Sequence, residues 1–113
     1  MNTLFNIIFS ETALVFLKNL ERPQYEKILS NIRKVQVKPD PKFFKKLNKD
    51  IWEFRTLYNG IQYRLFAFWD KTTSNDTLII CSHGYVKKEG KIPKKEIQKA
   101  LQFRNEYFNI IAK

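Results

Sequence analysis

Two arginines stand at positions where a β-hairpin would bring them face to face. Arg55 and Arg64 lie in two segments rich in aromatic and β-branched residues, 51–58 and 61–69, which are joined by Asn59-Gly60. An Asn-Gly pair between such segments predicts a two-residue turn, and that turn fixes a register in which Arg55 faces Arg64. Like charges placed opposite each other destabilise a sheet by up to about 1 kcal/mol, so the pair calls for an explanation. Guanidinium groups bind phosphate through two parallel hydrogen bonds, and the pair therefore predicts an anion clamp.

The alternative is that each arginine is neutralised by a carboxylate of its own. Side chains alternate between the two faces of a strand, so Glu53 shares a face with both arginines and is close enough to pair with one of them. Asp50 is a weaker candidate for the other. Glu53 could also act as a general base, but orientation of Arg55 is the role that we favour. The opposite face is apolar and is expected to pack against helices; its members are Trp52, Phe54, Tyr63, Leu65 and Ala67.

Lysines flank the predicted hairpin in two clusters and are candidates for binding phosphate. They are Lys45, Lys46 and Lys49 before the first hairpin strand, and Lys87, Lys88 and Lys91 after the third strand. Lys87 or Lys88 could act as a general base if crowding by neighbouring cations favours its neutral form. For the three lysines at the start of the last helix (Lys94, Lys95 and Lys99), a solvated helix face is the simpler interpretation.

The single histidine, His83, ends a predicted strand at 77–83, just before the second lysine cluster. An imidazole at this place could transfer protons, or it could be a strand-end residue that makes one hydrogen bond; both interpretations stay open. One histidine, one cysteine and scattered carboxylates give no spacing of metal ligands. A glycine-rich phosphate loop is also missing from a chain with three glycines. We therefore expect neither a metal nor a cofactor.

Composition limits the partners. The chain has 113 residues, with 21 Lys and Arg against 11 Asp and Glu and a formal net charge of +10, and we expect one domain over residues 1–113. Such an excess of positive charge indicates a nucleic acid, an anionic membrane surface or an acidic protein as partner. No apolar stretch approaches the roughly 18–20 residues of a membrane span, and the first residues do not resemble a signal peptide. The lone Cys81 cannot form an internal disulfide, so we expect a cytoplasmic protein.

Hydrophobic periodicity predicts the elements that position these residues. The apolar run 4–9 predicts a strand, and Ser10 can cap a helix that reaches residue 20. Pro23 suits the first turn of a second helix, whose apolar positions continue to Val35. The hairpin, the strand 77–83 and a helix from Pro93 to Phe108 complete the order β-α-α-β-β-β-α. This order predicts an α+β fold: a small, curved, mostly antiparallel sheet with the helices packed on one side.

The ordered set of motifs resembles the RelE/ParE toxin superfamily, most closely its HigB-like, phage-derived branch. The matching segments are Lys45-Lys46-Leu47, Ile51-Trp52-Glu53-Phe54-Arg55, Tyr63-Arg64-Leu65-Phe66-Ala67-Phe68 and Gly84-Tyr85-Val86-Lys87-Lys88, followed by Pro93, Ile97, Ala100 and Tyr107. The resemblance covers residues 43–108 strongly and the N-terminal helices only in outline. Tyr85 departs from the pattern, because the branch usually has phenylalanine there; it keeps the ring and adds a hydroxyl group.

This resemblance implies the toxin half of a type II toxin–antitoxin pair. Such a toxin is a metal-independent endoribonuclease that cleaves mRNA in the ribosomal A site, and a cognate antitoxin, often of helix-turn-helix type, neutralises it. The 2′-hydroxyl of the RNA attacks the adjacent phosphate, and a histidine or tyrosine in some relatives supports His83 and Tyr85 as acid or base. The catalytic candidates are Arg55, Arg64, Lys87, Lys88, Glu53 and His83, and the RNA-binding candidates are Lys45, Lys46, Lys49, Tyr85 and Lys91.

Two other functions remain open on the sequence. The first is a ParE-like toxin that binds gyrase and cleaves no RNA. The second is a basic nucleic-acid-binding accessory protein without toxicity, whose binding would weaken steeply with salt. The nuclease differs from both in requiring Arg55, Arg64 and the segment Lys87-Lys88 to converge on one place.

Overall fold

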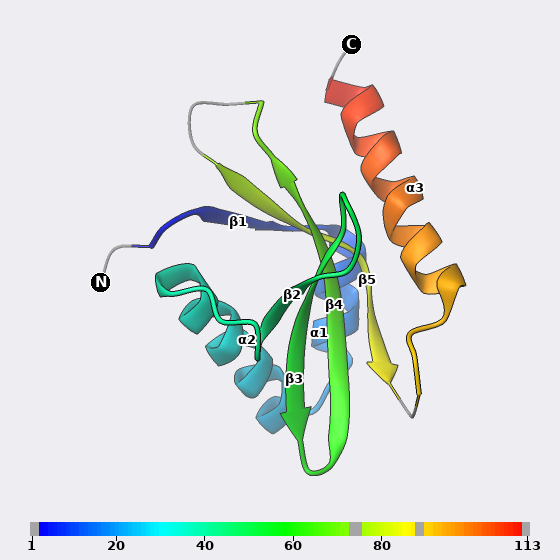
Figure 1. Ribbon diagram of the computed structural model, residues 1–113. Coiled ribbons are helices and arrows are strands. Elements are labelled where there is room, and N and C mark those ends of the chain that lie inside the picture. The colour runs from blue at the N-terminus through cyan, green and yellow to red at the C-terminus, as the bar shows by residue number, and fades with distance from the viewer. Residues whose placement is uncertain (1–2, 73–75, 88–89, 112–113) are drawn as a thin grey trace.

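The computed structural model describes residues 3–72, 76–87 and 90–111, and the side chains of 78–83 are not described. The elements in chain order are β1 (Asn6–Phe9), α1 (Glu11–Lys18), α2 (Arg22–Val37), β2 (Phe44–Lys46), β3 (Trp52–Tyr58), β4 (Ile61–Asp70), β5 (Thr77–Lys87) and α3 (Lys94–Ile111). The predicted order β-α-α-β-β-β-α is confirmed, with the three-residue strand β2 as an addition (Figure 1).

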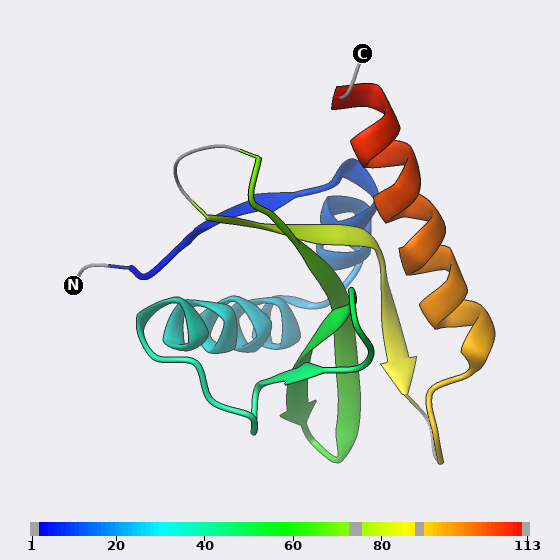
Figure 2. The ribbon, with the colours of Figure 1, turned by 45° about the horizontal axis from the view of Figure 1, so that its top comes forward.

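The five strands form one sheet in the order β1-β5-β4-β3-β2. β2, β3, β4 and β5 pair antiparallel, and β1 pairs parallel to the first part of β5, beside which it runs in Figure 2. The predicted hairpin is confirmed residue by residue, with Tyr58 opposite Ile61 and Arg55 opposite Arg64. Asn59 and Gly60 both have positive φ, 50° and 76°, as a type I′ turn requires.

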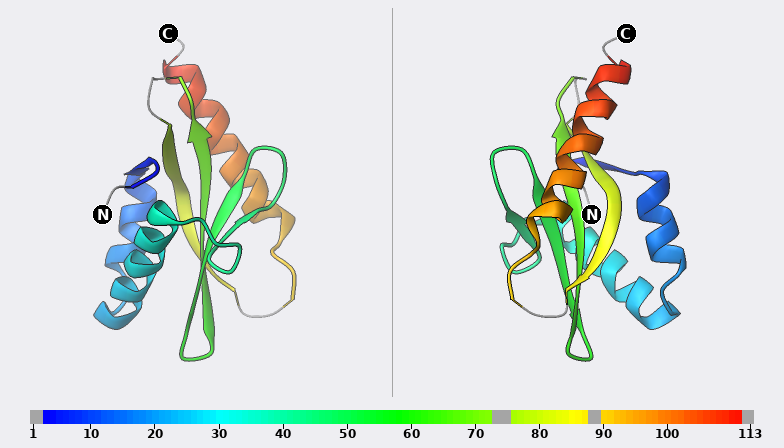
Figure 3. Two further views of the ribbon diagram at one scale, coloured as in Figure 1. Left: turned by 60° about the vertical axis from the view of Figure 1, so that its left-hand side comes forward. Right: turned by 90° about the vertical axis from the view of Figure 1, so that its right-hand side faces the viewer.

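The prediction that all helices pack on one side of the sheet is wrong. α1 and α2 cover one face, where Phe54, Tyr63 and Leu65 enter the main core, while α3 covers part of the other face (Figure 3). The second core forms around Phe66, Phe68 and Ala100. The reason is visible in β4, where every residue from 63 to 68 is buried. A central strand that is buried on both faces needs a cover on each side, and α3 provides the second.

The start of α1 confirms the predicted cap, because the Ser10 side chain accepts a hydrogen bond from the backbone N–H of Ala13 at 3.1 Å. Pro23 lies in the first turn of α2, as predicted. Helix α2 is fixed to β3 by a buried hydrogen bond of 3.1 Å, which the Asn31 amide donates to the Thr56 hydroxyl. This hydrogen bond holds the face of β3 that lies away from Arg55.

Gly84 of β5 lies in close contact with the Phe16 ring of α1. A methyl group at this position would lie 2.1 Å from the nearest ring carbon of Phe16 and 2.3 Å from its Cγ. Because overpacking of this kind forces side chains and backbone apart, Gly84→Ala is expected to lower the free energy of unfolding by about 1–3 kcal/mol in urea denaturation. The loss should shrink when Gly84→Ala is made in a Phe16→Ala background. Equal losses in both backgrounds would show that the ring is not the obstacle.

A buried carboxylate at the end of β4 anchors α3. The Tyr107 hydroxyl donates a hydrogen bond of 2.5 Å to Asp70, and Thr72 donates two more through its backbone N–H and its hydroxyl. Burial opposes ionisation of Asp70, but these hydrogen bonds hold its pKa below the usual value. Burial and the contact with Asp70 raise the pKa of Tyr107 to about 12.

The raised pKa of Tyr107 predicts how the anchor responds to alkali. The folded state binds the phenolic proton more tightly than the unfolded state, so the stabilisation is complete below pH 10 and is lost as pH approaches about 12. Below pH 10, Tyr107→Phe is expected to lower the free energy of unfolding by about 1–3 kcal/mol through the lost hydrogen bond. Denaturation at several pH values should show this difference from wild type shrinking above pH 10, whereas a difference that stays constant to pH 12 would contradict it.

Candidate functional site: a cationic face on the sheet

The two arginines of the hairpin lie side by side and share one carboxylate. Glu53 Oε1 lies 3.3 Å from Nε of Arg55 and 3.8 Å from a terminal nitrogen of Arg64. The guanidinium of Arg64 also donates a hydrogen bond to the side-chain oxygen of Gln62, two residues earlier on the same face. The sequence left an anion clamp and carboxylate partners as alternatives. The structure shows a carboxylate partner that serves both guanidinium groups, and the anion clamp stays a prediction.

Neighbouring strands add further cations to this face. Side chains opposite each other in adjacent antiparallel strands lie on the same face of a sheet. Lys45 of β2 lies opposite Glu53, Tyr85 of β5 lies opposite Arg64, and Lys87 lies opposite Gln62. Four strands thus contribute to one surface, which we call the cationic face, defined by Lys45, Arg55, Arg64 and Lys87 around Glu53.

Keeping Glu53 ionised costs free energy. Burial raises the pKa of its carboxyl group above the usual value, although the charges of Arg64, Arg55, Lys87 and Lys45 all lower it. Burial also lowers the pKa of Arg64, an effect that Glu53 opposes and Arg55 increases. Among the described residues, Oε2 of Glu53 and Nε of Arg64 have no hydrogen-bond partner. Buried charges that are incompletely paired destabilise a fold, and perturbed groups of this kind concentrate at functional sites.

The two arginines differ in their access to solvent. The side chain of Arg64 is 3% exposed, as is that of Glu53, whereas the side chain of Arg55 is 31% exposed. Both arginines border a cavity of about 270 Å³, together with Gln62, Leu57 and the segment Lys42-Phe43. The side chain of Arg55 is therefore accessible to solvent, whereas Arg64 is a buried charge in the wall of the cavity. The sequence had not separated these two roles.

The other candidates are not shown to join the cationic face. Lys46 is opposite Trp52, on the face of α1 and α2, and its ammonium lies 6.0 Å from the centre of that indole ring. Lys49 and Lys91 are exposed and lie outside the strands and helices. Lys88 and the side chain of His83 lie outside the described residues, so their proposed roles stay predictions.

Five residues that line the cavity were not predicted as site residues: Lys42, Phe43, Thr56, Leu57 and Gln62. Gln62 could have been found, because it precedes Arg64 by two positions and alternation places both on one face. Lys42 and Phe43 had no such signal, since they precede the three-residue strand β2, which is too short to predict from periodicity. Phe43 is nonetheless tied to the site, because its carbonyl oxygen accepts a hydrogen bond of 2.8 Å from the backbone N–H of Arg55.

Comparison with known families identifies the chain. The model of the family described as phage derived protein Gp49-like (DUF891) matches residues 15–105. The chain belongs to this family. The match confirms that the chain is of a phage-derived family, as the resemblance implied. The Gp49-like family is associated with RelE-like toxins, but no RelE/ParE family model matched the chain. No curated protein and no solved structure matched the chain.

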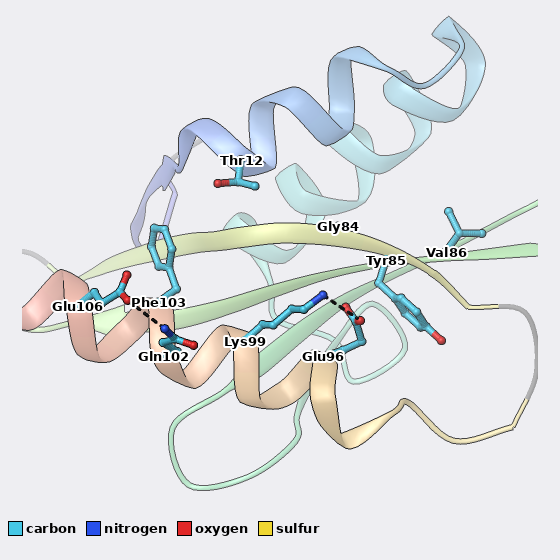
Figure 4. Close-up of a pocket in the computed structure, with 9 residues that line it drawn as sticks. All are labelled: Thr12, Gly84, Tyr85, Val86, Glu96, Lys99, Gln102, Phe103 and Glu106. Carbon is cyan, nitrogen blue, oxygen red and sulfur yellow. Dashed lines mark hydrogen bonds and ion pairs between the residues drawn. The ribbon is translucent and has the colours of Figure 1, made fainter.

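The Gp49-like match includes every residue of the cationic face and excludes the last six residues of α3. A larger hollow, of about 630 Å³, lies between the start of α1, β5 and α3 (Figure 4). Its wall contains two polar pairs, Lys99–Glu96 at 3.6 Å and Gln102–Glu106 at 3.2 Å. Two carboxylates in this wall make it a poor site for a phosphate, in contrast to the cationic face.

Neither metal ligands nor a membrane helix is found where the structure describes the chain. Within residues 3–72, 76–87 and 90–111, apart from the side chains of 78–83, histidines, cysteines and carboxylates form no group of three that could hold a metal ion. In the same ranges, each helix is too short or too polar to cross a bilayer.

Proposed function

We propose that this Gp49-like protein is the toxin of a type II toxin–antitoxin system and cleaves mRNA on the ribosome without a metal. The observation that carries the proposal is the convergence of Lys45, Arg55, Arg64 and Lys87 on one carboxylate beside an open cavity. A formal net charge of +10 supports a polyanionic substrate. The family's association with RelE-like toxins supports the toxin role.

The proposed reaction uses the RNA's own nucleophile. The 2′-oxygen forms a bond to the adjacent phosphorus while the bond from phosphorus to the 5′-oxygen breaks, giving a 2′,3′-cyclic phosphate and a 5′-hydroxyl end. The transition state carries additional negative charge on the phosphate oxygens, and preorganised cations are effective at stabilising it. Arg55 contacts the phosphate. The buried charge of Arg64 beside it makes the electrostatic potential at the phosphate more positive.

Glu53 acts in this proposal as a positioning residue. Its side chain is 3% exposed and pairs with both guanidinium groups, so we assign general-base catalysis to another group. Tyr85 and Lys87, opposite Arg64 and Gln62, carry the side chains of this face that can exchange protons with the substrate. Lys45 binds the phosphate backbone.

The partners follow from the same proposal. The protein acts in the cytoplasm, where ribosomes and mRNA are present, and a cognate antitoxin, of helix-turn-helix type in many such pairs, neutralises it. A single cysteine suits a reducing compartment.

Inducible expression followed by mapping of mRNA 5′ ends tests this function. We expect growth arrest and new 5′ ends within translated codons from wild type and from Arg22→Ala, and neither from Arg55→Ala. Arg22 is a matched control because it is an exposed arginine on α2, 86% exposed and paired only with Glu26 among the described residues. Growth arrest with DNA damage and intact mRNA would instead indicate a gyrase-binding toxin. Absence of any effect from stable wild-type protein would contradict the toxin role.

A further inference from the structure

We propose that the cavity beside Arg55 is a nucleobase subsite in which the ring of Phe43 stacks on one base of the RNA. The inference rests on the proposed function. It adds a site at which the protein binds a nucleobase of the RNA substrate. The subsite consists of Phe43, Leu57 and Gln62, next to the phosphate that Arg55 contacts.

The backbone fixes Phe43 relative to Arg55. Besides the 2.8 Å hydrogen bond from the N–H of Arg55 to the carbonyl of Phe43, the N–H of Phe43 donates to the carbonyl of Asp40 at 2.9 Å. The ring is half-buried and packs at the edge of the main core. These hydrogen bonds therefore fix the position of the Phe43 ring relative to the Arg55 guanidinium. Recognition of a base and its adjoining phosphate requires such a fixed spacing.

The cavity has walls suited to a base. The ring of Phe43 and the side chain of Leu57, which is 61% exposed, give it apolar surface. Exposed aromatic and apolar side chains at nucleic-acid sites bind unstacked bases of single strands. Since Arg64 occupies the oxygen of the Gln62 amide, the NH₂ group of that amide can donate to an acceptor on the base edge.

Cationic side chains around Phe43 can bind the phosphates of the same RNA strand. The ammonium groups of Lys34 and Lys42 each lie 5.5 Å from the centre of the Phe43 ring, and both side chains are exposed. Long flexible lysines can leave the ring for a phosphate when a base arrives. Phe43 also borders a second hollow, of about 460 Å³, whose wall includes Arg33, Lys34 and Lys38. The flanking nucleotides thus meet further cations.

The size of the cavity favours a single base. Its volume of about 270 Å³ lies below the roughly 300–1,000 Å³ of pockets that enclose drug-sized ligands. A base of a single strand fits such a space, whereas recognition of a duplex uses a groove and a longer surface.

Binding of two oligonucleotides tests the subsite. The probes are a 2′-O-methyl RNA, which the protein cannot cleave, and the same strand with abasic positions, measured by fluorescence anisotropy. Phe43→Leu is expected to weaken binding of the base-containing strand roughly 5- to 150-fold and to leave the abasic strand unchanged. Phe43→Tyr, which keeps the ring, should bind both strands as wild type does.

Leu57→Ser is the second variant. Because Leu57 is exposed, this substitution should not change the stability of the fold. It is expected to cause a smaller loss, again only with the base-containing strand. Equal effects of these variants on both strands, or no effect on either, would overturn the subsite. If wild type cleaves mRNA but the variants bind as wild type does, only the subsite is wrong; if wild type binds neither strand, the subsite and the RNA substrate both fail.

Discussion

Glu53→Ala is expected to lower the free energy of unfolding by about 3–5 kcal/mol, because it leaves Arg64 buried without its counter-charge. Arg64 is 3% exposed, so water does little to replace the carboxylate as its partner. The loss is measured by urea denaturation. Glu26→Ala is the matched control, since it removes the carboxylate of an exposed ion pair on α2 and should change stability by less than about 1 kcal/mol.

A double variant separates the buried charge from ordinary packing loss. Replacing the pair together, as Glu53→Leu with Arg64→Met, removes the charges and keeps apolar volume, so it is expected to recover most of the stability lost in Glu53→Ala. The same variant should be inactive in cells. If Glu53→Ala costs less than about 1 kcal/mol, or if the double variant is as unstable as the single one, the carboxylate is not the counter-charge that the fold requires.

Arg55→Ala is expected to reduce the rate of mRNA cleavage by about 100- to 1,000-fold, the effect typical of losing one preorganised group that stabilises a transition-state charge. Because the side chain of Arg55 is 31% exposed, its removal should change the free energy of unfolding by less than about 1 kcal/mol. The rate is measured with purified protein on ribosomes programmed with a defined mRNA.

Two comparisons make this result specific. Arg55→Lys should recover only part of the rate, because an ammonium group cannot form the two parallel hydrogen bonds of a guanidinium. Arg22→Ala removes the same kind of side chain from an exposed place on α2 and should leave the rate unchanged. An Arg55→Ala rate within about threefold of wild type would remove Arg55 from the reaction.

Sequence periodicity was sufficient to predict the centre of the site. The turn at Asn59-Gly60 determines the pairing of Arg55 with Arg64, and strand alternation then places Glu53 with them. Both rules are local, so they needed no knowledge of the rest of the fold. The position of Lys87 did not follow from the predicted strand, which ended at residue 83. β5 runs four residues further, and this extension brings Lys87 opposite Gln62.

What the sequence did not predict depends on tertiary packing. The apolar run at 65–68 is compatible with a strand packed on one face, and only the position of α3 shows that the strand is covered on both faces. Lys42 and Phe43 reach the cavity through a hydrogen bond between segments twelve residues apart, which no periodicity reveals.

The salt dependence of RNA binding tests most directly whether the cationic face holds the RNA backbone. For a single strand, the slope of log K against log [NaCl] changes by about 0.7 for each phosphate contact. With an uncleavable 2′-O-methyl RNA, we predict that Arg55→Ala flattens the slope by about this amount and that Arg22→Ala leaves it unchanged. The same slope for wild type and Arg55→Ala would contradict the account, because the phosphate would then bind elsewhere.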